Sequence, residues 1–256
     1  MAKAKIEIRN LHKAFGSNKV LSGIDLKVEK GESVVVMGGS GTGKSVLIKC
    51  ILGLLQPDEG EILLDGENVL NLSRSRRVEM MSSFGMLFQG GALFDSMKVW
   101  ENIAFGLIQG KGIPRNEARE IAYEKLAAVN LAQKIGNLYP AELSGGMQKR
   151  VGLARAIAGN PEVIFFDEPT TGLDPITSGV INQLIRNCTT EVGVSAVSIT
   201  HDIPSMRYIG DRAALLFKGQ IIWNGKVSAI DSSKNAYVRQ FIGGLPEGPF
   251  TEKESN

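Results

Sequence analysis

The chain has 256 residues, of which 43% are hydrophobic and 22% charged, a composition typical of a soluble globular protein. The formal net charge is only +2, so charge alone gives no indication of a nucleic-acid partner. Two cysteines, Cys50 and Cys188, are too few for a disulfide framework; we interpret them as small buried hydrophobic residues of a protein in a reducing compartment.

No segment of the sequence resembles a signal peptide or a membrane span. The first residues, MAKAKIEIRN, lack the apolar core that a cleaved signal peptide needs. The longest apolar stretches, such as 34–37 and 213–217, are about five residues long, whereas a membrane span needs ~20. We therefore expect any role at a membrane to depend on a partner.

The first third of the chain predicts strands around a glycine-rich loop. Alternating apolar and polar residues over 5–31 predict half-buried antiparallel strands, with Gly16 and Gly31 in turns. Residues 33–37 are continuously apolar and β-branched, which predicts a strand buried on both faces. A glycine-rich segment and an amphipathic helix follow, and 60–66 predicts a further strand.

The rest of the chain alternates helices and strands. The pattern predicts two helices and two buried strands, at 114–131, 144–158, 163–166 and 194–199. A helix-rich stretch at about 95–160 interrupts the alternation, which predicts an α/β fold with a mostly parallel sheet and a helical insertion. Residues from Gly243 onward are rich in Gly, Pro and Glu and predict an irregular tail.

The segment Gly38-x4-Gly43-Lys44-Ser45 matches the phosphate-binding loop G-x-x-x-x-G-K-[ST]. Glycines let backbone N–H groups approach phosphate oxygens, and the helix that follows points its positive end at the same anion. Lys44 is expected to reach the β- and γ-phosphates, and the Ser45 hydroxyl to ligate Mg²⁺. The nucleotide-binding residues expected here are Gly38, Gly39, Ser40, Gly41, Thr42, Gly43, Lys44, Ser45 and Val46.

Polar residues at the ends of two later strands complete a hydrolytic site. Asp167 is expected to hold Mg²⁺ through water, and Glu168 to orient or deprotonate the attacking water. His201 follows another buried run and could donate a hydrogen bond to the γ-phosphate or to that water. Alone, each would be read as a solvated strand end or a capped side chain. Together with the phosphate-binding loop they predict nucleotide hydrolysis.

A second candidate phosphate site opens the helix at 144–158. Ser144 is a good N-cap, whereas Gly145 and Gly146 are poor helix formers and make sense if an anion approaches the backbone there. The alternative is a flexible turn before a helix. Because the chain already has one phosphate-binding loop, a second site suggests that nucleotide is held between two bodies.

Taken in order, these motifs resemble those of an ABC-type ATPase domain. The matching segments are Gly38–Ser45, Gln89, Leu143–Gly146, Asp167–Glu168, Gly172–Asp174 and His201, and the resemblance covers about residues 5–230. It implies a P-loop NTPase of ABC type with a RecA-like, mostly parallel core and N-terminal antiparallel strands. The implied regions are a core at 1–88 and 162–242, a helical subdomain at 89–161 and a C-terminal tail at 243–256.

The resemblance also implies partners and residue roles. The chain would form a head-to-tail homodimer with ATP and Mg²⁺ at the interface, each nucleotide lying between one phosphate-binding loop and the other chain's Ser144–Gly146. Gln89 would sense Mg²⁺ and the γ-phosphate, and Asp174 would lie in the loop beside the nucleotide. Phe15 would stack on adenine; the alternative is simple strand packing. The implied catalytic residues are Lys44, Gln89, Glu168 and His201, and the implied metal ligands are Ser45, Gln89 and Asp167.

The sequence departs from the family at one position. Met147 stands where the family signature usually has Gln, and Gln148 follows it. A thioether cannot make the hydrogen bonds of an amide, so the usual role of this position is not expected here. The anion site at Ser144–Gly146 is unaffected.

Among ABC proteins, the sequence favours a transporter subunit. The chain shows one ATPase domain without sustained heptads or a cysteine cluster, unlike chromosome, repair or translation proteins of the family. The basic run 74–77 lacks interleaved aromatic residues, so we interpret it as a solvated face and expect no nucleic-acid partner.

The segment after Gln89 predicts contact with a permease. Small residues at 90–92 would allow close approach of a partner, and four apolar side chains could line a groove for a partner helix or, alternatively, form the core of the helical subdomain. These side chains are Phe94, Met97, Trp100 and Phe105. This segment, the run LSGGM and the tail YVRQF followed by Gly248-Pro249 resemble ATPase subunits of Mla-type phospholipid transporters, which work with a permease and a lipid-binding MCE protein.

The sequence thus predicts a peripheral ATPase subunit of a lipid transporter, held at the cytoplasmic face of the inner membrane by an integral membrane permease, with an MCE-type protein in the same complex. The alternative is an ABC transporter ATPase for another substrate, such as an amino acid or a lipoprotein. An ABC ATPase acting on nucleic acid is the third interpretation.

Overall fold

Two β-sheets form the framework of a computed structural model that describes residues 3–251, apart from the side chain of Arg74. The first sheet is antiparallel, with the strand order β2-β1-β4-β5. Its strands are β1 (Ile6–Phe15), β2 (Asn18–Val28), β4 (Glu59–Leu64) and β5 (Glu67–Asn68). The two long strands β1 and β2 pair from Ile6↔Val28 to Phe15↔Asn18, which confirms the antiparallel pair expected over 5–31.

The second sheet is mostly parallel, with the strand order β10-β9-β3-β8-β7-β6. Its strands are β3 (Ser33–Met37), β6 (Phe84–Leu87), β7 (Val163–Asp167), β8 (Ser195–Thr200), β9 (Arg212–Phe217) and β10 (Gln220–Lys226). Only β10 runs antiparallel to its neighbour. Every residue of β3 and β8 is buried, as expected for strands covered on both faces. The predicted α/β class is therefore confirmed.

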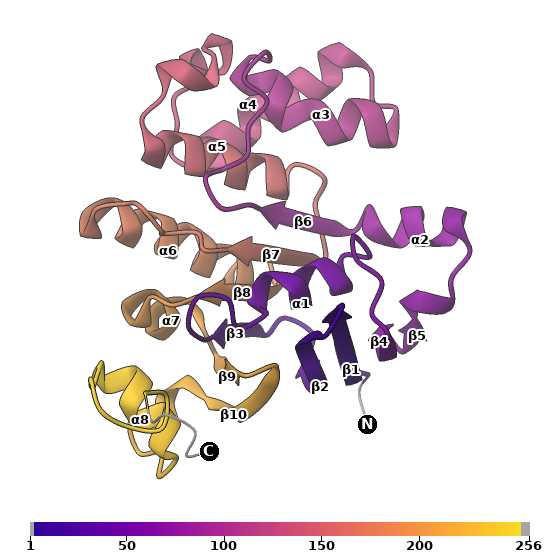
Figure 1. Cartoon of the computed structure of the whole chain (residues 1–256). Coiled ribbons are helices and arrows are strands. Elements are labelled where there is room, and N and C mark those ends of the chain that lie inside the picture. Colours follow the sequence, from indigo (N-terminus) through magenta and orange to yellow (C-terminus); the bar gives the residue numbers. More distant parts are fainter. Residues whose placement is uncertain (1–2, 252–256) are drawn as a thin grey trace.

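The helices cover both faces of the parallel sheet and form a lobe at the top of Figure 1. They are α1 (Lys44–Ile51), α2 (Arg74–Met81), α3 (Val99–Lys111), α4 (Arg115–Ala128), α5 (Gly145–Ile157), α6 (Pro175–Thr190), α7 (Ile203–Ile209) and α8 (Ala236–Gly243). The lobe consists of α3, α4 and α5, all inside 89–161, whereas the strands of both sheets lie outside this range. The boundaries 1–88, 89–161 and 162–242 stay a prediction.

Two hydrophobic cores hold these layers together. In one core, α1 lies between the two sheets, and Leu47 and Ile48 pack among side chains of β1, β2, β3 and β8. The other core joins the opposite face of the parallel sheet to α3–α7. Because α1 packs against one sheet on each side, the loop that connects β3 to α1 is held in a fixed position beside the parallel sheet.

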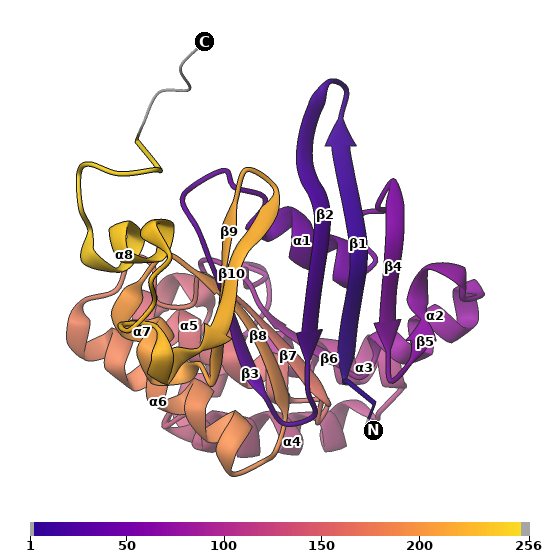
Figure 2. The same cartoon turned by 90° about the horizontal axis from the view of Figure 1, so that it is seen from below.

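The segment after α8 packs against the domain instead of standing free. The rings of Phe217, Tyr237 and Phe241 each lie within 5.8 Å of the Phe250 ring, measured between centroids. Figure 2 shows this segment and α8 beside β9 and β10. The expectation of an irregular tail from Gly243 holds for 244–251, which form turns, whereas Gly243 itself is the last residue of α8. Residues 252–256 of the predicted tail lie outside the described residues.

Within residues 3–251, no helix is both long and apolar enough to cross a bilayer.

Candidate nucleotide-binding and hydrolysis site

The phosphate-binding loop connects β3 to α1 and depends on glycine where the chain is crowded. A Cβ at Gly38 would lie 2.5 Å from the carbonyl oxygen of Leu216 in β9. Gly43, the N-cap of α1, has φ 103°, and a Cβ there would lie 2.9 Å from the carbonyl oxygen of Val20. The neighbouring strands therefore force the loop to turn tightly at both ends, where it leads into the N-terminus of α1.

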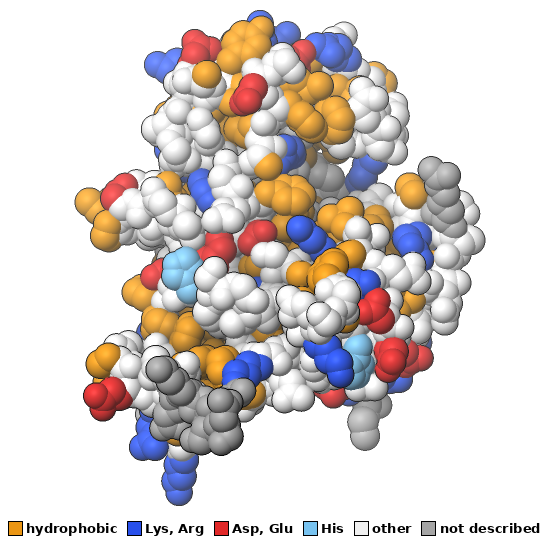
Figure 3. Space-filling view, viewed as in Figure 1, with side chains coloured by type: hydrophobic (Ala, Val, Ile, Leu, Met, Phe, Trp, Pro, Cys, Tyr) orange, Lys and Arg blue, Asp and Glu red, His pale blue; other side chains and the backbone are white. Residues whose placement is uncertain are grey.

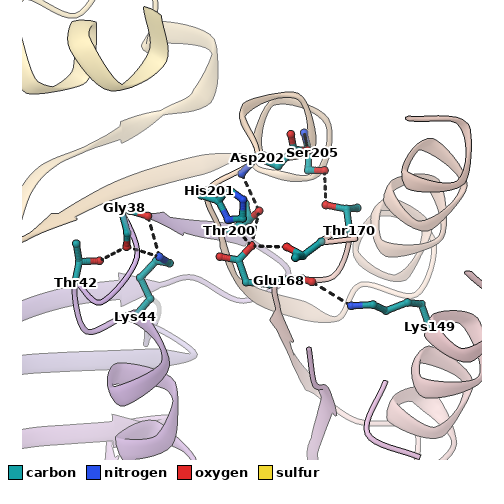
Figure 4. A network of polar contacts seen from close by, with 12 residues as sticks. Gly38, Thr42, Lys44, Lys149, Glu168, Thr170, Thr200, His201, Asp202 and Ser205 are labelled. Carbon is teal, nitrogen blue, oxygen red and sulfur yellow. Dashed lines mark hydrogen bonds and ion pairs between the residues drawn. The ribbon is translucent and has the colours of Figure 1, made fainter. Parts of the chain in front are cut away.

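Lys44 lies inside this loop. Its Nζ donates hydrogen bonds of 2.8 Å to the carbonyl oxygens of Gly38 and Gly39, and the residue is only 8% exposed (Figure 4). Burial lowers the pKa of the Lys44 ammonium, and the negative charges of Glu168 and Asp167 oppose that shift. The Thr42 hydroxyl also donates to the Gly39 carbonyl, over 3.0 Å. Lys44 is thus a nearly buried cation already aligned with the loop and with both acidic residues.

The strand order brings the remaining predicted residues to the same edge of the sheet. Because β3, β8, β7 and β6 are consecutive parallel neighbours, their carboxyl ends lie side by side. The side chains that follow these ends are His201 after β8, Asp167 and Glu168 at the end of β7, and Gln89 after β6. The phosphate-binding loop follows β3. Gln89 is exposed, and Ser45 is exposed in the first turn of α1.

Hydroxyl and imidazole groups fix the Glu168 carboxylate. Its Oε2 lies 2.9 Å from His201 Nδ1, and accepts hydrogen bonds from the hydroxyls of Thr171 at 3.0 Å and Thr200 at 3.4 Å (Figure 4). The Glu168 side chain is 12% exposed, whereas that of His201 is 60% exposed. The backbone of Glu168 has φ 47°, a left-handed conformation that costs a non-glycine residue about 1 kcal/mol or more. Such strain at a buried acid is typical of a catalytic position.

The donor set at this edge fits Mg²⁺. Burial, and then the charge of Glu168, raises the pKa of the Asp167 carboxyl, while Lys49, Lys149 and Lys44 lower it. A carboxylate in that position is stabilised by a further cation. The Asp167 carboxylate, the Ser45 hydroxyl and the Gln89 amide offer the oxygen ligands that Mg²⁺ prefers. Across residues 3–251, no cluster of three or more His, Cys, Asp or Glu residues could hold a metal ion.

The second candidate phosphate site lies at the start of α5. The Ser144 hydroxyl accepts a hydrogen bond from the Met147 N–H over 3.3 Å and caps the helix. Gly146 is buried, and a Cβ there would lie 2.5 Å from the Thr177 side chain of α6, so the packing of α5 on α6 already explains this glycine. Gly145 is exposed, and no atom lies closer than 4.0 Å to a Cβ placed there. Only Gly145 therefore still needs an approaching ligand to explain it.

Asp174 caps the N-terminus of α6. Its carboxylate accepts hydrogen bonds from the N–H groups of Ile176 at 2.9 Å and Thr177 at 3.0 Å, and from the Thr177 hydroxyl at 2.5 Å. These bonds, that of the Thr177 hydroxyl first, lower the pKa of the Asp174 carboxyl. The structure thus gives Asp174 a capping role, and its contact with nucleotide stays a prediction.

Phe15 ends β1 and is 50% exposed, with the Lys13 ammonium 5.6 Å from the centre of its ring. Its exposed aromatic face is available for stacking on a base, and that role stays a prediction.

Several polar residues around the acids were missed in the sequence. The hydroxyls of Thr171 and Thr200 hold Glu168, and the Lys149 ammonium donates to the Glu168 carbonyl oxygen over 3.2 Å. The two threonines directly flank the motifs, which is a usable signal. Lys149 had none, because a lysine near the start of a helix is ordinarily solvent-exposed.

An apolar groove of about 530 Å³ opens between α2 and α3 over β6. Figure 3 shows hydrophobic side chains where the molecule is hollowed between these two helices. Phe94 and Phe105 line this groove, with ring centroids 4.7 Å apart. The buried Asn102 positions Phe94, because its amide oxygen accepts the Phe94 N–H over 2.7 Å and its amide nitrogen donates to the Phe94 carbonyl over 3.1 Å.

The expectation of a groove-lining side chain is wrong for Trp100. Trp100 is only 6% exposed and belongs to the core of the lobe, where Arg115 and Arg119 lie over its ring, so it does not line the groove. Of the three small residues at 90–92, packing within the chain explains Gly91. Gly90 and Ala92 are exposed, and no atom lies within 4 Å of a Cβ placed at Gly90, so close approach of a partner there stays a prediction. A Cβ at Gly91 would lie 3.0 Å from the Gln148 carbonyl oxygen, and the segment is tied to α5 by Arg155, which donates to the Gly91 and Ala92 carbonyl oxygens.

Comparison with known proteins decides the family. A family model described as ABC transporter matches residues 21–171, more than half of the chain. The chain belongs to the ABC transporter family. It is therefore an ABC-type ATPase that binds and hydrolyses ATP, and the α/β fold described above is the P-loop fold of this family.

Two kinds of curated relative carry informative names. An Escherichia coli protein named "Intermembrane phospholipid transport system ATP-binding protein MlaF" is 40% identical over 244 residues, which cover 95% of this chain and 90% of the relative. A Mycobacterium tuberculosis protein named "Probable ribonucleotide transport ATP-binding protein mkl" is 39% identical over 249 residues, covering 97% of this chain and 69% of the relative.

Solved structures agree with the fold. The ABC transporter cassette MJ0796, solved as a dimer, matches with a TM-score of 0.80 at 33% identity over 87% of this chain and 98% of that chain. The same cassette was also solved in a post-hydrolysis state with ADP and Pi. The cassette cbiO1 from Clostridium perfringens matches with a TM-score of 0.81 at 28% identity, covering 95% of this chain and 96% of that chain.

Proposed function

We propose that this ABC ATPase powers the movement of phospholipid through a separate integral membrane permease. The observation that carries the proposal is the 40% identity to the relative named for intermembrane phospholipid transport, with both chains covered almost from end to end. The relative named for ribonucleotide transport is nearly as similar, but only 69% of its length is covered. Agreement over the whole length favours phospholipid.

In the proposed reaction, the phosphate-binding loop and Lys44 hold the β- and γ-phosphates, and Glu168 takes a proton from the attacking water. His201 holds Glu168 on one side and faces solvent on the other, so it can donate to the γ-phosphate or the water. Ser45, Gln89 and Asp167 would hold Mg²⁺, which neutralises phosphate charge when bound. Phe15 would stack on the base.

A second copy of the chain would complete each site. Ser144 and Gly145 are exposed at the positive end of α5, and among the described residues no hydrogen bond or ion pair joins them to Gly38–Ser45. A head-to-tail homodimer would place them against the ATP held by the partner's loop. Asp174, at the nearby start of α6, would then lie at the same interface.

The groove between α2 and α3 would receive the permease. Its apolar lining and exposed aromatic rings suit the apolar face of a short amphipathic helix. This docking would place the subunit at the cytoplasmic face of the inner membrane as a peripheral protein. A lipid-binding MCE-type protein would belong to the same complex, as expected from the resemblance of the sequence to Mla-type ATPases.

The first experiment is purification of the tagged chain from native membranes in mild detergent, followed by mass spectrometry of bound proteins and lipids. The expected result is a permease, an MCE-type protein and phospholipid. A permease with a different substrate-binding subunit would discard the lipid assignment and favour the alternative of an amino acid or lipoprotein transporter. Absence from the membrane fraction, with ATPase activity stimulated by DNA or RNA, would favour the nucleic-acid class.

A matched pair of variants tests the groove. Phe94→Glu puts a charge into it and is expected to lose the permease while keeping the melting temperature. Val192→Glu places the same charge on an exposed side chain between α6 and β8 and is expected to copurify normally. Equal recovery of the permease with both variants would refute the groove as the docking site.

A further inference from the structure

We propose that Lys149 is a positioning residue that ties the helix α5 to the backbone of Glu168 and so couples the start of α5 to the catalytic carboxylate. The coupling in this proposal rests on the proposed homodimer, in which Ser144 and Gly145 contact the partner's nucleotide. The positioning part rests on the structure of one chain.

Lys149 is a buried cation. Burying its ammonium costs free energy that an apolar side chain of similar size would not cost. The residue is 4% exposed, although it lies only one turn into α5. Desolvation of a buried ammonium costs several kcal/mol unless hydrogen bonds and opposite charge compensate it. In the part of the chain that the structure describes, its one hydrogen bond runs from Nζ to the Glu168 carbonyl oxygen over 3.2 Å (Figure 4).

The Glu168 backbone is the strained part of the site, and few bonds hold it. Its N–H donates to the Ile199 carbonyl over 2.9 Å, which anchors it to β8. Its carbonyl oxygen accepts the Thr171 N–H over 3.3 Å and the Lys149 ammonium over 3.2 Å. The Glu168 carbonyl oxygen thus has two donors, and Lys149 is the charged one. Both donors hold a backbone whose φ is 47°. Loss of the Lys149 donor releases the peptide that aims the carboxylate.

The contact links two elements far apart in sequence. Lys149 belongs to the lobe of α3–α5, whereas Glu168 belongs to the edge of the parallel sheet. Ser144 caps the same helix five residues earlier, about 7.5 Å along the helix axis. Because the hydrogen bonds of an α-helix make a segment of one to two turns stiff, we expect a displacement of the start of α5 by a nucleotide on the partner chain to move Lys149 against Glu168. Each site would thus sense the occupancy of the other.

The test measures steady-state ATP hydrolysis by the full chain, in complex with the membrane proteins that copurify with it. Lys149→Met removes the charge and the hydrogen bond to the Glu168 carbonyl while keeping a similar side-chain length, and Lys149→Arg restores a charged donor. Arg150→Met is the matched control, because Arg150 is the next cation of α5 and donates to the Asn130 carbonyl over 3.0 Å, away from Glu168. Melting temperature and the affinity for a non-hydrolysable ATP analogue are measured for each variant.

Lys149→Met is expected to lower kcat by about 10- to 100-fold, as misplacement of a catalytic group does. Its analogue affinity should stay within about two-fold of wild type, and its Hill coefficient for ATP should fall towards 1. Lys149→Arg should recover kcat to within about three-fold, and Arg150→Met should match wild type. A change in packing alone would lower the melting temperature without this split between kcat and affinity.

A folded Lys149→Met protein with wild-type kcat overturns the inference, as does an equal loss of kcat and affinity. If that variant does not accumulate, Lys149→Gln takes its place, because its amide can donate without charge and its kcat is expected to lie below that of Lys149→Arg. Wild-type kcat in a folded Lys149→Gln protein overturns the charged contact. ATP hydrolysis and phospholipid recovery by the wild-type complex test the proposed function separately.

Discussion

Replacement of Glu168 by Gln separates nucleotide binding from hydrolysis. His201, Thr171 and Thr200 all converge on one carboxylate oxygen, Oε2. Among residues 3–251, Oε1 has no hydrogen-bond partner, so it is the oxygen available to accept a proton from water. A Gln side chain can present its amide oxygen to the same three groups and its NH₂ where Oε1 stood. The network is kept, and the base is lost.

The expected magnitude follows from the lost proton transfer. General base catalysis contributes about 10²- to 10⁴-fold, so kcat of Glu168→Gln should fall by that factor, roughly 2.7–5.5 kcal/mol of activation free energy. ATP affinity should change by less than about three-fold, because the phosphate-binding loop and Lys44 are untouched. The hydrogen bonds around the side chain are kept, so the melting temperature should stay close to wild type.

The assay combines phosphate release with equilibrium binding of ATP to the folded variant. Glu191→Gln is the matched control, because it makes the same chemical change at the exposed C-cap of α6. This variant should hydrolyse ATP at the wild-type rate. A folded Glu168→Gln protein that turns over within about five-fold of wild type would refute the assignment of Glu168 as the base. Loss of ATP binding would instead place Glu168 in substrate binding.

Three further predictions concern packing, thiols and assembly. Gly85→Ala places a Cβ 2.4 Å from the Ala156 carbonyl oxygen and should lower the free energy of unfolding by about 1–3 kcal/mol, which lowers the melting temperature by roughly 2–12 °C. Gly179→Ala is the control, because a Cβ there has open space in α6 and should raise the melting temperature slightly. Equal shifts of the two melting temperatures would contradict the packing argument. Burial raises the pKa of both Cys50 and Cys188 from 9.0 to about 11. Because the thiolate is the reactive form, alkylation of both thiols at pH 8 should be about 100-fold slower in the folded chain than in the urea-unfolded chain. Equal rates in the two states would show that the thiols are accessible in the folded chain. Ser144→Arg should abolish ATP-dependent dimers in size-exclusion chromatography, and normal dimers would refute the cross-chain role of α5.

Local patterns predicted the elements well, because each depends on neighbouring residues. The continuous apolar run of β3 and the alternation in β1 and β2 are visible in short windows, and so is the phosphate-binding loop. The order β3-β8-β7-β6 is not visible there, since it depends on pairing between distant segments; β8 begins at Ser195, more than 150 residues after β3 ends at Met37. The motifs at strand ends indicated a shared edge only once a parallel sheet was assumed.

Side-chain environments were the harder part. Trp100 could equally line a groove or fill a core, because an aromatic residue on a helix suits both, and only its burial in the folded lobe decides between them. Gly146 pointed to a ligand but is also required by the Thr177 side chain of a helix that follows later in the sequence. The role of Lys149 could not be predicted from the sequence, because its partner is a backbone carbonyl and every residue type has one.

The position of β3 in the sheet has a consequence during protein synthesis. Both of its neighbours, β8 and β9, are encoded far downstream, and β8 begins only at Ser195. At about 5–20 residues per second, translation needs roughly 8–30 s to make the chain between Met37 and Ser195. For that time a five-residue strand that is fully buried in the folded protein has neither of its sheet neighbours. The nascent chain should therefore depend on chaperones during this interval and aggregate when elongation is slowed between the two strands.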